Sequence, residues 1–201
     1  VLVDGVARVP HLPTDVEALG IDVLSTSPYK WYGPHAGCLI VRNGLLQEIE
    51  PYRVRPADYD GPPRWETGTA QIELLAGITA AAEFMLETPI AEEAERETRL
   101  LALLQEGLSD ISGVTVRGPS VTPDRAPTLV FTVEGHHPDA VAAHLASRRI
   151  AVWSGDNYAQ ELVDAWGLRE TGGVVRAGVV RYTTADDVVA LLQGVAALTE
   201  G

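Results

Sequence analysis

Residues 21–42 read IDVLSTSPYKWYGPHAGCLIVR, and this stretch decides how the first half of the 201-residue chain folds. Two short apolar runs, at 21–27 and 37–42, flank a turn rich in Ser, Pro, Tyr and Gly. Short apolar runs bounded by such residues are typical of buried strands. The run VLVDG at 1–5 has the same character. We therefore expect three neighbouring strands in a sheet that is covered on both faces.

The turn between the two runs holds Lys30, the only lysine among the 15 basic residues of the chain. Arginine keeps its proton in proteins, whereas a lysine amine can attack a carbonyl group once it is deprotonated. A lone lysine at a strand end is therefore a candidate for covalent chemistry. A surface lysine without a role is the alternative.

Polar residues follow the ends of the first two strands. Asp4 ends the first strand, and Ser27 and Lys30 come just after the second. Ligands of parallel sheets bind at the carboxyl ends of the strands. An amine and a carboxylate there suit pyridoxal phosphate, because the lysine can form a Schiff base and the carboxylate can keep the pyridine nitrogen protonated. Taken alone, Asp4 could equally be a turn or cap residue.

The rest of the chain predicts an α/β protein in two parts, 1–90 and 91–201. In the first part we expect helices and one long irregular loop, and in the second a small α+β domain. The first part has helices at 14–20 and 71–87, a loop at 51–70, and an amphipathic helix from 90 to 111 that leads into the second. The second has strands at 114–118, 128–133, 149–155 and 173–182, and helices at 138–147, 158–166 and 184–198.

Composition narrows the class of partners. The net charge of −13 disfavours nucleic acid and anionic membranes, and no apolar run approaches the length of a membrane span. The single cysteine, Cys38, excludes an internal disulfide and suits a cytoplasmic location. The five histidines lack the spacing of a metal site. Because VLVDG reads as a core strand from its first residue, we expect a longer polypeptide that continues upstream.

Four segments resemble one family. The stretch from Val3 to Leu39 is similar to the cofactor-binding segment of class V aminotransferases, in the cysteine desulfurase-like branch, with its S-x-x-K and G-P elements. The same family's pattern is found in RWETGT (64–69), RIAVWSGDNYA (149–159) and GGVVRAGVVRYTTADDV (172–188). The resemblance implies the fold of the type I pyridoxal-phosphate-dependent transferases, which is that of aspartate aminotransferase. Residues 1–90 would then end the large cofactor-binding domain, and 91–201 would form the small C-terminal domain.

The resemblance also implies roles for single residues. Lys30 matches the Schiff-base lysine, and Asp4 matches the acid that pairs with the pyridine nitrogen. Ser27 matches a hydroxyl that binds the cofactor phosphate, and Thr69 matches a residue that reaches the phosphate of the neighbouring subunit. Arg176 matches the arginine that binds the substrate carboxylate.

Two features of the residues add to these roles. The apolar flanks of Arg176, in VVRAGVV, lead us to expect a position that is not wholly exposed. Arg64 and Glu66 could pair and shape their loop.

The pattern is broken at several positions. Desulfurases carry a nucleophilic cysteine in R-T-G-H-H-C-A, and this chain has WSGDNYA, with Tyr158 at that place. Ala7 stands where the family has Gln or His against the ring oxygen of the cofactor. Cys38 reads as a small core residue and does not replace the missing thiol. Tyr29 and Tyr158 are candidate proton carriers, and His35 could approach the cofactor or substrate.

The resemblance therefore implies a pyridoxal-phosphate enzyme that acts on an amino acid, a desulfurase-like C–S lyase without the catalytic cysteine. An epimerase similar to the isopenicillin N epimerase group and an aminotransferase are alternatives. A non-catalytic relative that binds the cofactor or a partner protein is another. The family implies a homodimer with shared active sites.

Overall fold

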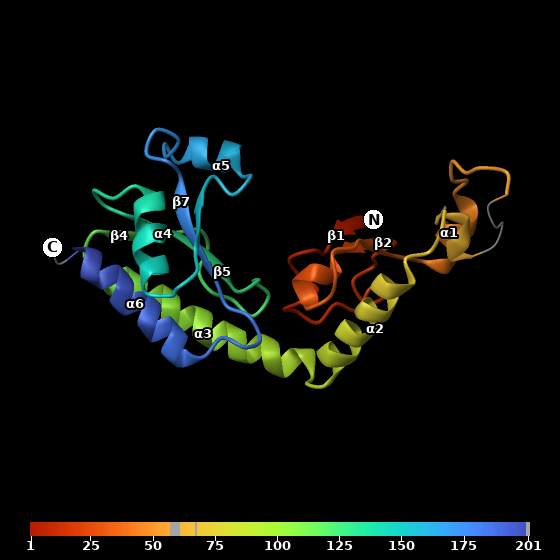
Figure 1. Ribbon diagram of the computed structural model, residues 1–201, viewed down its shortest axis with the longest axis horizontal. Coiled ribbons are helices and arrows are strands. Elements are labelled where there is room, and N and C mark those ends of the chain that lie inside the picture. Colours follow the sequence, from red (N-terminus) through yellow and green to blue (C-terminus); the bar gives the residue numbers. More distant parts are fainter. Residues whose placement is uncertain (57–60, 67, 200–201) are drawn as a thin grey trace. The chain divides into compact units, whose positions relative to one another are not determined.

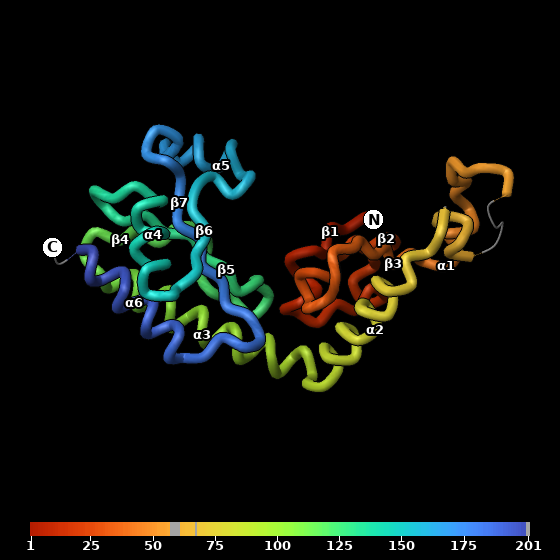
Figure 2. Tube along the Cα trace, in the orientation of Figure 1, coloured from red at the N-terminus to blue at the C-terminus, as the bar shows by residue number. Residues whose placement is uncertain are grey.

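The computed structural model describes residues 1–56, 61–66 and 68–199, and it divides into two compact units (Figures 1 and 2). The N-terminal unit covers Val1–Glu92 and the C-terminal unit covers Glu93–Gly201. The long helix α3 (Ile90–Asp110) begins in the first unit and runs into the second. The two units are described separately below.

Three short strands form the sheet of the N-terminal unit, in the order β1-β2-β3. β1 (Leu2–Asp4) is parallel to β2 (Val23–Thr26), and β2 is antiparallel to β3 (Cys38–Val41). The expected strands are present, and each is shorter than its apolar run. The connection between β2 and β3 is too short for a parallel crossover, so β3 must run back along β2.

The expectation that this sheet is covered on both faces is wrong for the described residues. Leu2 on β1 is 70% exposed and Leu39 on β3 is 66% exposed. The helix α2 (Ile72–Leu86) matches the predicted helix, but Ala81 is its one buried residue in the described chain. The packed contacts of α2 are with the turn after β2. The apolar character of the strands and of α2 therefore exceeds what the described neighbours bury.

The predicted helix at 14–20 is a single turn. Asp15 accepts hydrogen bonds from the backbone N–H groups of Glu17 and Ala18, both at 3.0 Å. Gly20 then leaves the helical region with a φ of +64°. Residues 14–20 therefore form a capped turn and no α-helix.

Three short elements were not predicted from the sequence. They are the 3₁₀ turn η1 (Pro28–Trp31), the helix α1 (Asn43–Glu48) and the 3₁₀ turn η2 (Pro62–Arg64). Residues 57–60 of the predicted loop 51–70, and Thr67, lie outside the described residues.

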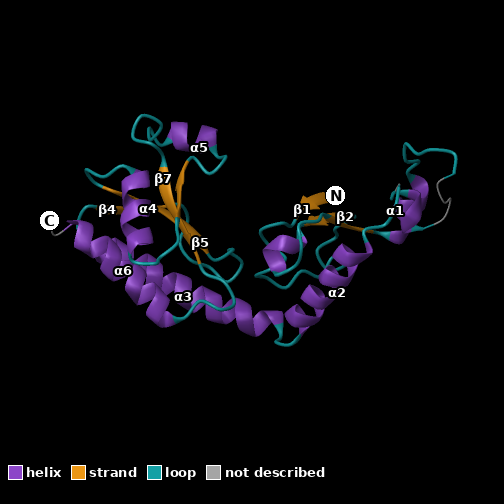
Figure 3. Ribbon diagram, viewed as in Figure 1, coloured by secondary structure: helices purple, strands orange, loops and turns teal. Residues whose placement is uncertain are grey.

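The C-terminal unit is built on a four-stranded antiparallel sheet in the order β4-β5-β7-β6 (Figure 3). The three helices α3, α4 and α6 pack with it into one hydrophobic core, in which Phe131 and Val175 are fully buried. The strands are β4 (Val114–Arg117), β5 (Thr128–Val133), β6 (Trp153–Gly155) and β7 (Val174–Gly178). The other helices are α4 (Pro138–Ser147), α5 (Gln160–Ala165) and α6 (Ala185–Thr199).

In the described chain, no single helix is both long and apolar enough to cross a membrane. Taken together, α2 and α3 have the length and the apolar composition of a membrane span, but the two helices are bent by 75° at their junction.

Two leucines of α3 lie on different faces of the helix. Leu101 is fully buried in the core, and Leu103 is 40% exposed. We expect Leu101→Ala to lower the free energy of unfolding by about 2–5 kcal/mol, since it leaves a cavity in the core. Leu103→Ala, the same change on the outer face of the same helix, should cost less than about 1 kcal/mol. Urea unfolding followed by circular dichroism measures both. Equal losses from the two variants would contradict this placement of α3.

Candidate active site

The parallel pairing of β1 and β2 brings two predicted site regions to one edge of the sheet. Asp4 is opposite Ser25 in the register. Ser27 lies two residues beyond Ser25, and η1, which carries Lys30, follows immediately. Because the strands run in the same direction, their carboxyl ends share an edge, so Asp4, Ser27 and Lys30 follow the same end of the sheet.

The turn that carries Lys30 is fixed by hydrogen bonds within it. The indole Nε1 of Trp31 donates to the Thr26 hydroxyl at 3.0 Å, and both residues are buried. The Lys30 N–H donates to the Ser27 carbonyl at 2.9 Å, and the Gly33 N–H donates to the Pro28 carbonyl at 2.8 Å. The backbone of the lysine is therefore held on both sides.

Helix α2 packs against this turn from outside. A Cβ on Gly33 would lie 3.0 Å from the Pro28 side chain and 3.2 Å from Ala81 on α2, so only glycine lets the turn approach the helix this closely. The ring of Tyr32 meets the edge of Phe84 on α2, with centroids 5.1 Å apart. Tyr32 itself has a φ of +72°. A side-chain contact therefore supports this uncommon backbone conformation.

The three polar side chains at this edge keep groups available for a ligand. Lys30 is exposed, and within the described chain its ammonium forms no ion pair and no side-chain hydrogen bond. Asp4 is exposed and accepts one hydrogen bond, from the Val6 N–H at 2.9 Å. The Ser27 hydroxyl does not cap η1. Pyridoxal phosphate requires an amine for its aldehyde, a carboxylate for its ring nitrogen and hydrogen-bond donors such as a hydroxyl for its phosphate. These three residues therefore fit that cofactor.

Two other predicted residues of this unit lie near the same elements. Ala7 is exposed in the turn that follows β1 and offers no polar group. His35 stacks on Tyr29, the residue before Lys30, with ring centroids 5.2 Å apart and planes at 20°. Both rings are exposed. The stacking ties His35 to the lysine turn.

The loop after α1 contains Thr69, which is exposed. Arg64 in this loop is buried and pairs with Glu50, and its Nη1 donates to the Gln47 carbonyl at 3.5 Å. The expected pairing of Arg64 with Glu66 is therefore wrong, because the guanidinium of Arg64 pairs with the Glu50 carboxylate instead. The role of Thr69 stays a prediction.

Cys38 lies half-buried on β3. Burial raises the pKa of its thiol, and the negative charge of Glu66 raises it further. A raised thiol pKa leaves little thiolate at neutral pH, and the thiolate is the nucleophile. Cys38 is thus a poor substitute for a catalytic cysteine.

Arg176 lies on β7 in the C-terminal unit, between Val130 of β5 and Trp153 of β6 in the register. Its chain neighbours Val175 and Ala177 are buried, and Arg176 is exposed. The expectation that this position is not wholly exposed stays a prediction. Successive residues of a strand point to opposite faces, so apolar neighbours in the core turn Arg176 outward.

The sequence did not reveal which residues accompany Arg176 on its face. Trp153, on β6, is directly opposite it and is 60% exposed. Arg117, on β4, pairs with Val130 in the same row, and its guanidinium lies 5.8 Å from the ring of Trp166. The Arg117 Nε is buried without a hydrogen-bond partner in the described chain. Alternation indicates the face of each residue, but only the strand order shows that they form one row.

Tyr158 lies in a turn with unusual backbone angles. Asn157 and Tyr158 have φ values of +53° and +61°, a region that L-residues other than Asn and Asp seldom adopt. The Tyr158 N–H donates to the Asp156 carboxylate at 2.9 Å. The Tyr158 side chain is 97% exposed. The turn therefore presents to solvent the phenol that the family resemblance matches to the catalytic cysteine.

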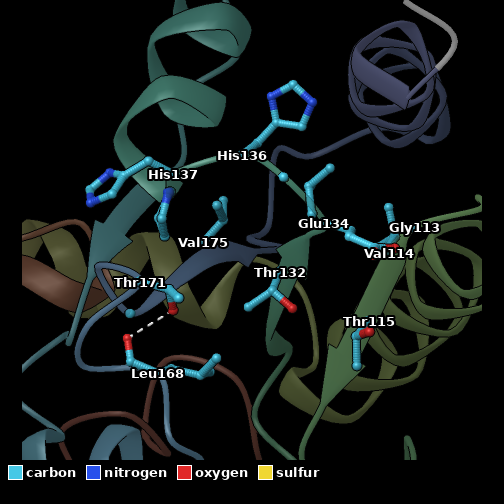
Figure 4. A pocket seen from close by; sticks show the side chains of 14 residues that line it. Gly113, Val114, Thr115, Thr132, Glu134, His136, His137, Leu168, Thr171 and Val175 are labelled. Carbon is cyan, nitrogen blue, oxygen red and sulfur yellow. Dashed lines mark hydrogen bonds between the residues drawn. The ribbon is translucent and has the colours of Figure 1, made fainter.

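A cavity of about 720 Å³ lies elsewhere in the C-terminal unit, at the start of α4 (Figure 4). It is lined by residues 113–115 and 132–138, which include His136 and His137, and by Leu168, Thr171, Gly173 and Val175. None of the predicted site residues is part of its wall. In the described residues, no group of three or more His, Cys, Asp or Glu could hold a metal ion.

The comparisons with known sequences agree in one family. A family model described as aminotransferase class-V matches residues 1–191. A probable cysteine desulfurase of Mycolicibacterium paratuberculosis is 32% identical over 100% of this chain and 30% of its own length. One of Xylella fastidiosa strain 9a5c is 30% identical over 93% of this chain and 47% of its own length. The chain thus spans half or less of the length of these relatives.

Solved structures agree with the fold. The cysteine desulfurase CsdA of Escherichia coli, in its S-sulfonic acid form, superposes with a TM-score of 0.86 and 28% identity. The match covers 100% of this chain and 51% of that one. Apo cysteine desulfurase from Thermococcus onnurineus NA1 superposes with a TM-score of 0.89 and 26% identity. That match covers 100% of this chain and 52% of the other. The predicted α/β transferase fold is confirmed, and the chain belongs to the class V aminotransferase family, in its cysteine desulfurase-like branch.

Proposed function

We propose that this chain carries the cofactor-attaching lysine and the substrate-binding arginine of a pyridoxal-phosphate enzyme that acts on an amino acid. The observation that carries the proposal is the Lys30 amine. It has no partner in the described chain, and it lies on a fixed turn at the end of the sheet that Asp4 also reaches. Membership of the class V aminotransferase family supports the same conclusion.

Three residues of the N-terminal unit would each bind a different part of the cofactor. Lys30 would hold it covalently through the aldehyde, Asp4 would pair with the ring nitrogen, and Ser27 would donate to the phosphate. When bound, the cofactor supplies an electron sink for the bond that breaks at the substrate α-carbon. The side chain of Ala7 cannot hydrogen-bond to the ring oxygen, so the ring would be held with one hydrogen bond fewer than a Gln or His would give.

Arg176 would bind the α-carboxylate of the substrate. Its guanidinium is exposed and forms no ion pair within the described chain. A planar guanidinium can donate two parallel hydrogen bonds to a carboxylate, which fixes the orientation of the substrate as well as its position. Lys30, once released from the cofactor, would take the α-proton.

The absence of a reactive thiol at position 158 limits which reaction can follow removal of the α-proton. Tyr158 cannot accept sulfur as a persulfide, and Cys38 is mostly protonated at neutral pH. With cysteine as substrate, the reaction would then be an elimination. The α-proton leaves, the Cβ–S bond breaks, and hydrolysis of the remaining fragment gives pyruvate and ammonia beside free sulfide.

One observation favours a second outcome. The exposed Tyr158 phenol is a group that can carry a proton, and returning a proton to the α-carbon from a different side would epimerise the substrate. We keep epimerisation as the second candidate. A homodimer that shares its active sites through Thr69, and a cytoplasmic location, are proposals that follow from the family and the composition.

A product panel on the whole protein tests the function. L-cysteine and other L-amino acids are incubated with the cofactor-loaded protein, and sulfide, pyruvate, keto acid and D-amino acid are measured. Sulfide with equimolar pyruvate supports the lyase, D-amino acid supports the epimerase, and keto acid with consumption of an acceptor supports a transaminase. Failure to form any product with any amino acid would favour the non-catalytic relative.

Lys30→Ala should abolish covalent attachment of the cofactor, because the variant has no amine at this turn. In the unmodified protein, borohydride should leave a reduced adduct on Lys30, found by peptide mass spectrometry. Lys30→Arg is the matched control, since it keeps the positive charge without a nucleophilic amine. It should lose the adduct as fully as Lys30→Ala does. An adduct that persists on another residue in both variants would refute the assignment.

The Cys38 thiol should react slowly with iodoacetamide at neutral pH. We expect a rate at least about threefold below that of free cysteine, rising as the pH passes the elevated pKa, because only the thiolate reacts. Mass spectrometry of the Cys38 peptide gives the rate. Glu66→Gln should lower the pKa and speed the reaction, while Glu73→Gln on α2 should not. A neutral-pH rate equal to that of free cysteine would show that the thiol is not suppressed.

A further inference from the structure

Arg176 has an aromatic neighbour that the proposed function does not use. Trp153 on β6 is its direct partner in the antiparallel register. Side chains of directly opposed residues leave the same face of the sheet, with Cβ atoms about 4.5–5.5 Å apart. The indole and the guanidinium therefore start from adjacent points on one surface.

The local contacts show which face this is. Ser154, the next residue, donates to the Asp139 carboxylate of α4 at 2.6 Å, so it faces the helices. Trp153 must then face away from them, and it is 60% exposed. No aromatic ring or cation stacks on its indole among the described residues. A large apolar ring thus remains available beside a cation.

The chemistry of the row fits one kind of ligand. Arg176 lies between Val130 and Trp153, so its charge is flanked on both sides by apolar side chains. A carboxylate that pairs with the guanidinium would bring the ligand's hydrocarbon part against the indole. A small or charged side chain would gain nothing from that surface.

We propose that Trp153 is a specificity-determining residue, which selects carboxylate ligands with an apolar, above all aromatic, side chain over small ones. The proposal rests on the role of Arg176 in the proposed function. It narrows the substrate class to amino acids whose side chain, or whose thiolate leaving group, is bulky and apolar.

The test uses two carboxylates without an amino group, 3-phenylpropionate and propionate, which can bind to the whole protein without reacting. Calorimetric titration gives the dissociation constant of each. The unmodified protein should prefer 3-phenylpropionate by about tenfold, since a ring–ring contact and the buried area both favour it. Trp153→Ala should reduce this preference to less than about threefold, and Trp153→Phe should keep most of it.

Two further variants separate this inference from the proposed function. Arg176→Gln should weaken both ligands by a similar factor, because both depend on the carboxylate. Leu103→Ala, a truncation of an exposed side chain on α3, should change neither. If Arg176→Gln weakens both ligands while Trp153→Ala leaves the preference intact, the role of Trp153 is refuted and the carboxylate site stands. If Arg176→Gln changes neither constant, the carboxylate site itself is wrong and both proposals fail.

Discussion

The pairing of β1 with β2 is the constraint on which the N-terminal unit depends. The two strands lie parallel, with Asp4 opposite Ser25, although Ser25 lies 21 positions after Asp4 along the chain. Gly5 permits this closeness, since a Cβ there would lie 2.5 Å from the Leu24 side chain. A slip of one residue would turn Asp4 to the opposite face of the sheet. The position of the carboxylate relative to the lysine turn is therefore a consequence of register.

Rigidity at the lysine turn comes from its neighbours and not from the lysine. The buried Trp31–Thr26 hydrogen bond and the contact of Gly33 with Ala81 hold the backbone on either side of Lys30. The side chain itself extends from this support into solvent. A fixed backbone with a free amine is what covalent attachment needs, because the nucleophile must reach a ligand without the turn unfolding.

The sequence predicts the long elements and misses those that depend on distant partners. Helices α2, α3, α4 and α6 follow from apolar periodicity over ten or more residues, and the structure has all four close to the predicted bounds. The seven-residue segment 14–20 carries capping signals too, but in the structure it forms turns and no α-helix. Helix α1 has no such periodicity in its six residues and was missed.

The candidate site shows the same contrast between residues with a local sequence signal and residues that depend on distant partners. Lys30, Asp4 and Ser27 could be proposed because each lies at or shortly after the end of a strand, which is a local signal, and the family resemblance implied their roles. The row of Arg176 with Trp153 could not be found, because it depends on the pairing of β6 with β7 across an intervening helix and turn. The outward direction of Arg176 follows from alternation alone, because its chain neighbours Val175 and Ala177 are buried in the core.

The distribution of basic residues now has a physical explanation. Arginine is permanently charged and planar, which suits the binding of a carboxylate but prevents nucleophilic attack. The C-terminal unit accordingly presents arginines on its open sheet face, Arg176 next to Trp153 and Arg117 against Trp166. The N-terminal unit presents the one lysine, at a strand end and without an acidic partner among the described residues. A carboxylate close enough to pair with that amine would favour its protonated form and oppose attack on an aldehyde. The separation of Lys30 from any ion pair is therefore a chemical requirement of the role proposed for it, whereas the arginines need no such isolation.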